Sequence, residues 1–260
     1  MQYVWYPYLR NLYYLGWDPH LYRVFSTLLD PNFAGIIFAF TLFLGAYLWQ
    51  KTKRQSLVLL SQLLTLVALF LTYSRSSYVA FFLGGFIFVL RLKMAKLGLV
   101  LAAVFIAILL LLPRPGGEGV KLFRTVSTFA RLGNWQRGME LIREAPLLGH
   151  GFNTLRYVQR AKGWVDDSTI VSKAGAGIDS SIQFVWATTG VVGLAMYGWL
   201  FFRMLQMART STAYLATLGA VLVHSAFSNS LFYPWVLLWL WILTGSIERI
   251  EKQDPSLRSG

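Results

Sequence analysis

Long apolar runs separated by short polar segments dominate the pattern of this 260-residue chain. A helix needs roughly 20 mostly apolar residues to cross a bilayer, and seven runs come near that length. They lie at about residues 33–50, 55–74, 77–92, 97–113, 181–203, 211–231 and 233–247. A tight turn near Phe232 to Pro234 separates the last two. We therefore predict an all-α fold, a polytopic transmembrane helical bundle of about seven spans.

One long stretch, residues 114–180, has no apolar run of this length. A helical pattern extends from about 121 to 145, where Pro146 ends it, and Asn153 is expected to cap a short helix at about 154–161. A loop this long between packed helices is usually functional. We predict an interfacial segment, four spans, a large partly helical outer (periplasmic) loop, three spans and a tail. Their bounds are 1–32, 33–113, 114–180, 181–247 and 248–260.

The basic residues indicate how the bundle is oriented. The chain has 24 Lys and Arg against 11 Asp and Glu, and many of the basic residues lie between alternate spans or after the last one. These are Lys51, Lys53, Arg54, Arg91, Lys93, Lys96, Arg203, Arg209, Arg249, Lys252 and Arg258. All fall on one side of the seven-span arrangement, which the positive-inside rule makes cytoplasmic. Since these residues are explained as topology signals, we do not expect nucleic acid as a partner.

The composition agrees with a membrane protein. Hydrophobic residues make up 56% of the chain and charged residues 13%, whereas soluble domains carry about a quarter charged residues. The chain has no cysteine, which excludes disulfides, thiolate metal sites and cysteine catalysis. The first 20 residues are aromatic and do not fit the pattern of a signal peptide.

Four arginines on the predicted outer side are candidate ligands for an anion. Arg23 precedes the first span, Arg75 lies where the second span turns into the third, and Arg124 and Arg131 lie in the outer loop. Trp135 follows Arg131 by four residues, on the same face of a helix. Guanidinium groups suit the geometry of phosphate better than ammonium groups do. The alternatives are an interfacial role for Arg75 and a solvent-facing charge for Arg124.

Asp179 stands directly before the fifth span and has two possible roles. It could cap that helix. However, Ser180 and Gln183 already fit the spacing of a capping box, which would leave the Asp179 carboxylate able to accept a proton. Asp179 is therefore a candidate base.

The histidines give weaker signals. His224 lies inside the sixth span, where an ionisable group is a functional candidate, although it could equally be a neutral side chain bonded between helices. His150 lies in a Gly-flanked turn, and we interpret it as a structural residue. Asn32 is expected to cap the first span. No His, Asp or Glu set has metal-ligand spacing and no Gly-rich nucleotide loop is present, so neither metal nor nucleotide cofactor is expected.

In their order along the chain, these residues resemble the O-antigen ligase and polymerase family of membrane glycosyltransferases. The matching stretches are Arg23 through Asn32, Thr72-Tyr-Ser-Arg75-Ser-Ser, Arg131-xxx-Trp135, Ala145-Pro-Leu-Leu-Gly-His-Gly151, and Asp179-Ser180 followed after nine residues by Gly190-xx-Gly193. The resemblance covers roughly Tyr22 to Gly245. Since family members usually have several further spans at the N-terminus, the chain resembles their C-terminal part.

The resemblance implies a metal-independent glycosyl transfer at the periplasmic face of the bacterial inner membrane. The donor would be an undecaprenyl-pyrophosphate-linked glycan, and the acceptor a glycan or a lipid A-core-like molecule. Arg75 and Arg131 would hold the pyrophosphate, and Asp179 occupies the position of the histidine that serves as base in the ligases. This departure favours polymerases, or ligases for other acceptors. Further substrate-binding candidates are Arg23, Arg124, Trp135, Ser180 and His224.

Two other functions remain open from the sequence. The first is a transporter or flippase of a lipid-linked oligosaccharide, although such proteins often contain internal repeats and none is visible. The second is a non-catalytic subunit that completes a split glycosyltransferase, with a partner subunit supplying the N-terminal spans. Membrane lipids would surround the protein in either case.

Overall fold

The computed structural model describes residues 22–28, 30–113, 118–121, 125–166 and 177–253, and no strand occurs in these ranges. The helices are η1 (Ser26–Leu28), α3 (Pro31–Lys51), α4 (Gln55–Leu71), α5 (Arg75–Arg91), α6 (Ala95–Leu111), η2 (Glu118–Val120), α7 (Thr125–Glu144), α8 (Leu155–Ala161), α9 (Ser181–Ala208), α10 (Thr212–Ser225), η4 (Ser230–Phe232) and α11 (Pro234–Gln253). Each predicted apolar run thus contains an α-helix, and α7 and α8 lie in the predicted outer loop. The all-α prediction is confirmed.

Both predicted asparagine caps are wrong. The side chain of Asp30, not that of Asn32, accepts hydrogen bonds from the first backbone N–H groups of α3. Pro31 takes the first helical position, where its fixed φ fits and its missing N–H costs nothing, so the capping residue must precede it. At α8 the cap position is held by Thr154, while Asn153 adopts a positive φ of 61°.

α10 ends earlier than the apolar run 211–231 suggested. Its last residue is Ser225, and the backbone N–H groups of Phe227 and Ser228 both bond to the carbonyl of His224, at 3.0 and 2.9 Å. A turn of residues 226–233 therefore replaces the tight turn that we predicted between the last two spans. This segment reaches the candidate site described below.

The main core lies among α3, α5, α9, α10 and α11. Small buried residues let α5 and α10 approach closely, and Ala80, Ala216 and Ala220 are fully buried. A Cβ atom added to Gly84 would lie 2.8 Å from the carbonyl oxygen of Ala216. Close backbone approach through small residues is typical of helix pairs in membranes.

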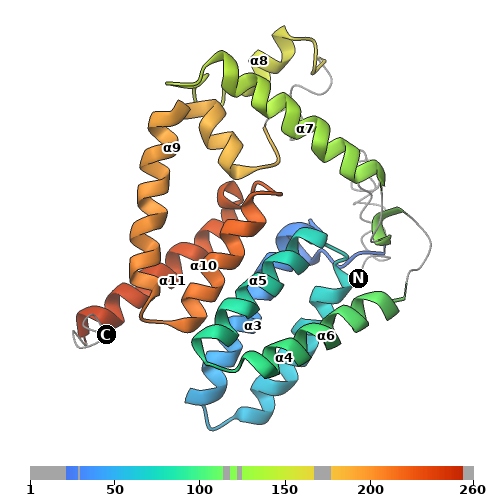
Figure 1. Ribbon diagram of the computed structural model, residues 1–260, viewed down its shortest axis with the longest axis vertical. Coiled ribbons are helices and arrows are strands. Elements are labelled where there is room, and N and C mark those ends of the chain that lie inside the picture. Colours follow the sequence, from blue (N-terminus) through green and yellow to red (C-terminus); the bar gives the residue numbers. More distant parts are fainter. Residues whose placement is uncertain (1–21, 29, 114–117, 122–124, 167–176, 254–260) are drawn as a thin grey trace.

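α9 is not the single straight span that the apolar run 181–203 suggested. The backbone at Gly190 leaves the helical region, with φ 67° and ψ −170°. Figure 1 shows α9 as two straight pieces that meet in a sharp bend below α7 and α8. The first piece leads back toward α7, and the second forms the long helix at the edge of the molecule.

The turn of residues 145–151 restores the hydrogen bonds that this bend breaks. His150 N–H and Gly151 N–H bond to the carbonyls of Ala187 and Thr188, at 2.9 and 2.8 Å. In return, the N–H groups of residues 191 and 192 bond to the carbonyls of residues 146 and 147, at 2.9 and 3.5 Å. Backbone groups left unpaired inside a protein are costly, so these bonds stabilise the bend. Two of the motifs that carry the resemblance, residues 145–151 and Gly190-xx-Gly193, therefore bond to each other. We call this contact between the turn and the bend of α9 the joint.

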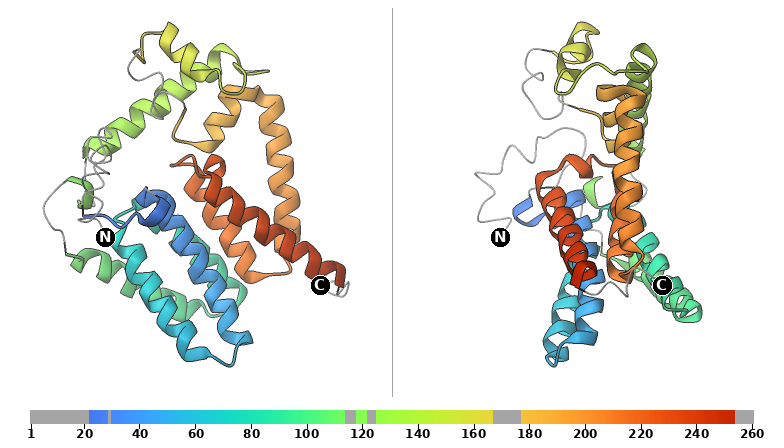
Figure 2. Two further views of the ribbon diagram at one scale, coloured as in Figure 1. Left: turned by 180° about the vertical axis from the view of Figure 1, so that it is seen from behind. Right: turned by 90° about the vertical axis from the view of Figure 1, so that its left-hand side faces the viewer.

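The predicted cytoplasmic connections lie together at one end of the molecule. In Figures 1 and 2, α7 and α8 lie at the opposite end from the α3–α4, α5–α6 and α9–α10 connections. The side chain of Arg91 donates a hydrogen bond to the carbonyl of Arg209, which ties two of these basic connections together. The grouping of these connections at one end agrees with the predicted orientation, which stays a prediction.

Two helical segments of the described chain, Pro31–Trp49 and Ser181–Ala208, are long and apolar enough to cross a membrane. Four shorter apolar helices accompany them, and they are Gln55–Leu71, Ala95–Leu111, Thr212–Ser225 and Pro234–Ile247. The number of spans and the domain bounds therefore stay predictions.

Candidate active site

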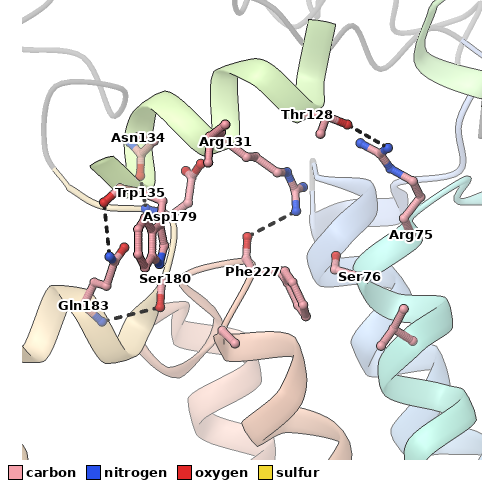
Figure 3. A pocket seen from close by; sticks show the side chains of 13 residues that line it. Arg75, Ser76, Thr128, Arg131, Asn134, Trp135, Asp179, Ser180, Gln183 and Phe227 are labelled. Carbon is pink, nitrogen blue, oxygen red and sulfur yellow. Dashed lines mark hydrogen bonds between the residues drawn. The ribbon is translucent and has the colours of Figure 1, made fainter. Parts of the chain in front are cut away.

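A cavity of about 390 Å³ lies under α7, between the N-terminus of α5 and the N-terminus of α9. Arg75, Arg131 and Asp179, the three residues predicted to carry the chemistry, all line it. Trp135 and Ser180, two of the predicted substrate-binding residues, line it too. Five predicted site residues from three separate parts of the chain thus share one cavity (Figure 3).

Arg75 is placed by the cap of its helix. The Ser74 side chain accepts a hydrogen bond from Ser77 N–H and caps α5, so that Arg75 is the first helical residue. Its guanidinium Nη1 donates to Thr128 Oγ1 of α7 at 3.1 Å. Figure 3 shows the side chain reaching toward α7 along one wall of the cavity. Arg75 therefore links the N-terminus of α5 to α7, which lies above it.

Arg131 enters the cavity from above. Its Nη1 donates to the carbonyl of Phe227 at 3.2 Å, and its Nε is buried with no hydrogen-bond partner among the residues that the structure describes. Trp135, one helical turn further along α7, lines the same cavity and is half exposed. The predicted common face of Arg131 and Trp135 is confirmed. Among the described residues, the protein supplies no acceptor for this N–H group.

Asp179 does not cap α9. Ser180 is the cap, and its hydroxyl accepts the hydrogen bond of Gln183 N–H at 3.4 Å. The predicted capping box forms only in part, because Gln183 Nε2 donates to the carbonyl of Trp135 at 3.2 Å instead of turning back. The backbone N–H of Asp179 donates to Asn134 Oδ1 at 2.8 Å. Its side chain thus stays in the cavity, as the candidate base requires.

Burial raises the pKa of the Asp179 carboxyl above its ordinary value of 3.8. The positive charge of Arg131 acts in the opposite direction, and the negative charge of Asp30 adds to the rise. Desolvation disfavours the charged form of an acid, whereas a nearby cation favours it. A carboxylate with a raised pKa is a better proton acceptor near neutral pH than an ordinary aspartate.

His224 lies behind the cavity rather than in its wall. It is fully buried. Its Nε2 lies 3.1 Å from Ser76 Oγ and 3.2 Å from Ser77 Oγ, and its Nδ1 lies 2.5 Å from Ser230 Oγ. The expected bonding between helices is therefore present. Because Ser76 itself lines the cavity, His224 supports the wall that carries Arg75.

The other predicted residues lie elsewhere. Arg23 is fully buried outside the cavity wall, and its Nε donates to the carbonyl of Thr72 at 2.8 Å. Arg124 lies outside the described residues. His150 Nε2 lies 2.9 Å from the carbonyl of Leu141, which agrees with its structural interpretation. Arg23 braces the turn before α5.

Sequence reasoning missed the polar residues that complete the cavity, namely Ser76, Thr128 and Asn134. Asn134 lies between Arg131 and Trp135 in the chain, so the spacing of the predicted pair was a signal that could have found it. Gln183 was noticed only as a capping residue. No group of three or more His, Cys, Asp or Glu residues converges within the described ranges.

The described residues define the class of the protein. It is all-helical, and α7, a helix of its longest polar segment, covers a cavity that is lined by two arginines. The chain belongs to the O-antigen ligase family, whose model matches residues 60–198. This match includes every cavity residue discussed above except Phe227.

One curated relative is an O-antigen ligase of Salmonella typhimurium. It is 24% identical to this chain over 235 residues, which cover 86% of the chain and 56% of the relative. The chain therefore spans about half the length of this relative.

Proposed function

We propose that the chain transfers a glycan from an undecaprenyl-pyrophosphate-linked donor to a hydroxyl group of an acceptor. The acceptor would be a glycan or a lipid A-core-like molecule, so that the product is either a longer polysaccharide or a glycan attached to its final carrier. The observation that carries the proposal is the convergence of Arg75, Arg131 and Asp179 on one cavity. Membership of the O-antigen ligase family supports the reaction class.

In this proposal the two arginines bind the pyrophosphate of the donor. As the bond between the anomeric carbon and the phosphate oxygen breaks, negative charge grows on that oxygen. Arg131, whose Nε has no partner among the described residues, and Arg75 on the facing wall stabilise this charge. Fixed donors aimed at developing charge are among the strongest contributions to catalysis.

Asp179 serves as the base. The acceptor hydroxyl attacks the anomeric carbon, a new carbon–oxygen bond forms, and the hydroxyl proton passes to the Asp179 carboxylate. The lipid pyrophosphate leaves with the electron pair of the broken bond. The Asn134 side chain holds the backbone of Asp179 by accepting a hydrogen bond from the Asp179 N–H. α7 above the cavity limits the access of water.

The protein would sit in the bacterial inner membrane as a multi-pass protein with the cavity toward the periplasm. The basic connections at the end opposite α7 support this orientation, because cytoplasmic loops are rich in Lys and Arg. The exposed apolar faces of α4 and α6 would then face lipid. They include Leu60, Leu64, Leu99 and Val100.

Replacement of Arg131 tests the proposal. We expect Arg131→Ala to lower the rate of glycan transfer about a hundredfold, since removal of one donor to a developing oxyanion costs about 100-fold or more. Arg137→Ala is the matched control, because Arg137 lies on the same helix but stacks over the Trp164 ring at 5.6 Å and does not line the cavity. The assay follows transfer from a lipid-pyrophosphate glycan by reconstituted protein. Equal rates for both variants would remove Arg131 from the mechanism.

A further inference from the structure

Two neighbouring leucines in the predicted outer loop are largely exposed. Leu147 and Leu148 follow the end of α7, and 67% and 76% of their surface is accessible. They form the tip of the turn that holds the bend of α9, and we call them the leucine tip. A contiguous exposed apolar patch of sufficient area is a candidate surface for contact with a membrane or a partner.

The leucine tip cannot fold inward without breaking the joint. The backbone on both sides of it is bonded to α9, through the carbonyls of Pro146 and Leu147 and through the N–H groups of His150 and Gly151. Gly149 lies so close to α9 that an added Cβ would be 2.4 Å from the carbonyl carbon of Thr188. The exposure of the two leucines therefore follows from a fixed backbone.

The leucine tip continues an apolar stripe on α9. The N–H of Val192 bonds to the carbonyl of Leu147 at 3.5 Å, and Val192, Met196 and Trp199 are 52%, 71% and 62% exposed. Residues spaced by three and four positions lie on one face of a helix. The stripe thus begins next to the leucine tip and runs away from it along the second piece of α9.

The length of this piece places the leucine tip at a particular depth. The 18 residues from Val191 to Ala208 make about 27 Å of helix at 1.5 Å per residue, close to the roughly 30 Å of a bilayer's hydrocarbon core. If this piece spans the membrane, its upper end coincides with the outer boundary of the hydrocarbon. The leucine tip lies at that end, because the N–H groups of Val191 and Val192 bond to the carbonyls of Pro146 and Leu147.

We propose that the leucine tip inserts into the outer leaflet of the bilayer and anchors the outer loop to the membrane surface. A second protein is a poorer occupant, because two side chains supply far less than the roughly 1,200 Å² that a stable protein interface buries. The joint transmits this anchoring to the first piece of α9, which Ser180 caps and which carries Gln183. The inference depends on the membrane insertion of α9 and not on the proposed reaction.

Single-cysteine labelling tests the proposal directly, since the chain has no cysteine of its own. An environment-sensitive fluorophore is attached to Leu148→Cys, Met196→Cys or Gln136→Cys in protein reconstituted in phospholipid nanodiscs. Met196 stands on the α9 stripe and Gln136 is an exposed polar residue of α7. Quenching by nitroxides at known depths on the lipid chains is compared with quenching by iodide in water.

We expect the probe at residue 148 to be quenched by lipid nitroxides at a shallow depth, about 5–10 Å into the boundary region, and to be shielded from iodide. The probe at residue 196 should report a deeper position, and the probe at residue 136 should be quenched by iodide alone. A probe at residue 148 that behaves like that at residue 136, or that neither quencher reaches, would overturn the proposal. So would a probe at residue 196 that lipid nitroxides do not quench.

Discussion

Gly190→Ala is expected to destabilise the protein more than a Gly→Ala substitution at any other glycine of α9. The backbone at Gly190, with φ 67° and ψ −170°, lies in a region that is essentially closed to other residues, at a cost of about 1–3 kcal/mol. The new Cβ would also lie 2.0 Å from the carbonyl oxygen of Leu147. Overpacking typically costs a further amount of about 1–3 kcal/mol. The joint must therefore open or distort.

Gly198→Ala provides the control within the same helix. Nothing lies within 4 Å of a Cβ at Gly198, and alanine is a better helix former than glycine by about 1 kcal/mol. We expect the apparent midpoint of thermal unfolding in detergent to fall strongly for Gly190→Ala and to stay or rise for Gly198→Ala. Similar midpoints for the two variants would show that the bend of α9 is not fixed by Gly190.

Asp179→Asn is expected to reduce glycan transfer by about 100- to 10,000-fold, the usual contribution of a positioned acid or base. Asparagine keeps the size of the side chain and the backbone N–H bond to Asn134, but it cannot accept the proton of the acceptor. The fold should therefore survive while the rate falls. The assay is turnover of a lipid-pyrophosphate glycan at saturating donor.

Asp166→Asn is the matched control for this substitution, because Asp166 is exposed and does not line the cavity. Its rate should equal that of the unaltered protein. If Asp179→Asn also transfers glycan at the full rate, the base must be another group.

The pH dependence of transfer gives a second view of the same carboxylate. A base acts only when it is deprotonated, so the rate should fall as the pH decreases through the pKa of Asp179. Burial raises this pKa above its ordinary value of 3.8, and the fall should begin at a correspondingly higher pH. The charge of Arg131 lowers the same pKa. In Arg131→Ala the pKa of Asp179 should therefore be higher, and the residual activity should begin to fall at a higher pH than in the unaltered protein.

Local signals in the chain predicted most of the helices. Apolar runs gave the positions of α3, α4, α5 and α6 to within a few residues, because each is long enough to reveal itself without knowledge of its neighbours. The caps were less well predicted, since Asp30 and Asn32 are both good cap residues and only the position of Pro31 distinguishes them. The end of α10 also differed, because the turn after it is itself largely apolar.

The bend of α9 could not be read from its own residues. The apolar pattern continues through Gly190, and glycine alone does not reveal whether a helix breaks. The hydrogen bonds that compensate for the break come from residues 146–151, about 40 positions earlier. Only the pairing of the two segments in space explains why both carry glycine.

The candidate site was partly predictable for a similar reason. Arg75 and Asp179 stood out as charges beside an apolar run, and Arg131 through its spacing to Trp135, and the structure brings all three to one cavity. Arg23 stood out as a charge before the first span and His224 as an ionisable group inside a span, but both are buried and neither lines the cavity. A charge near a predicted membrane boundary indicates a role, but whether it faces a cavity or a buried neighbour depends on packing between distant segments.

The affinity of the reconstituted protein for a polyprenyl diphosphate, compared with that for the matching monophosphate, tests the central claim most directly. A hydrogen bond to a charged group contributes about 1.5–3 kcal/mol, so Arg75→Ala and Arg131→Ala should each weaken diphosphate binding by about 10- to 100-fold. Arg137→Ala should leave binding unchanged, and the monophosphate should bind more weakly throughout. Equal diphosphate affinity in all three variants would contradict the placement of a diphosphate between the two cavity arginines.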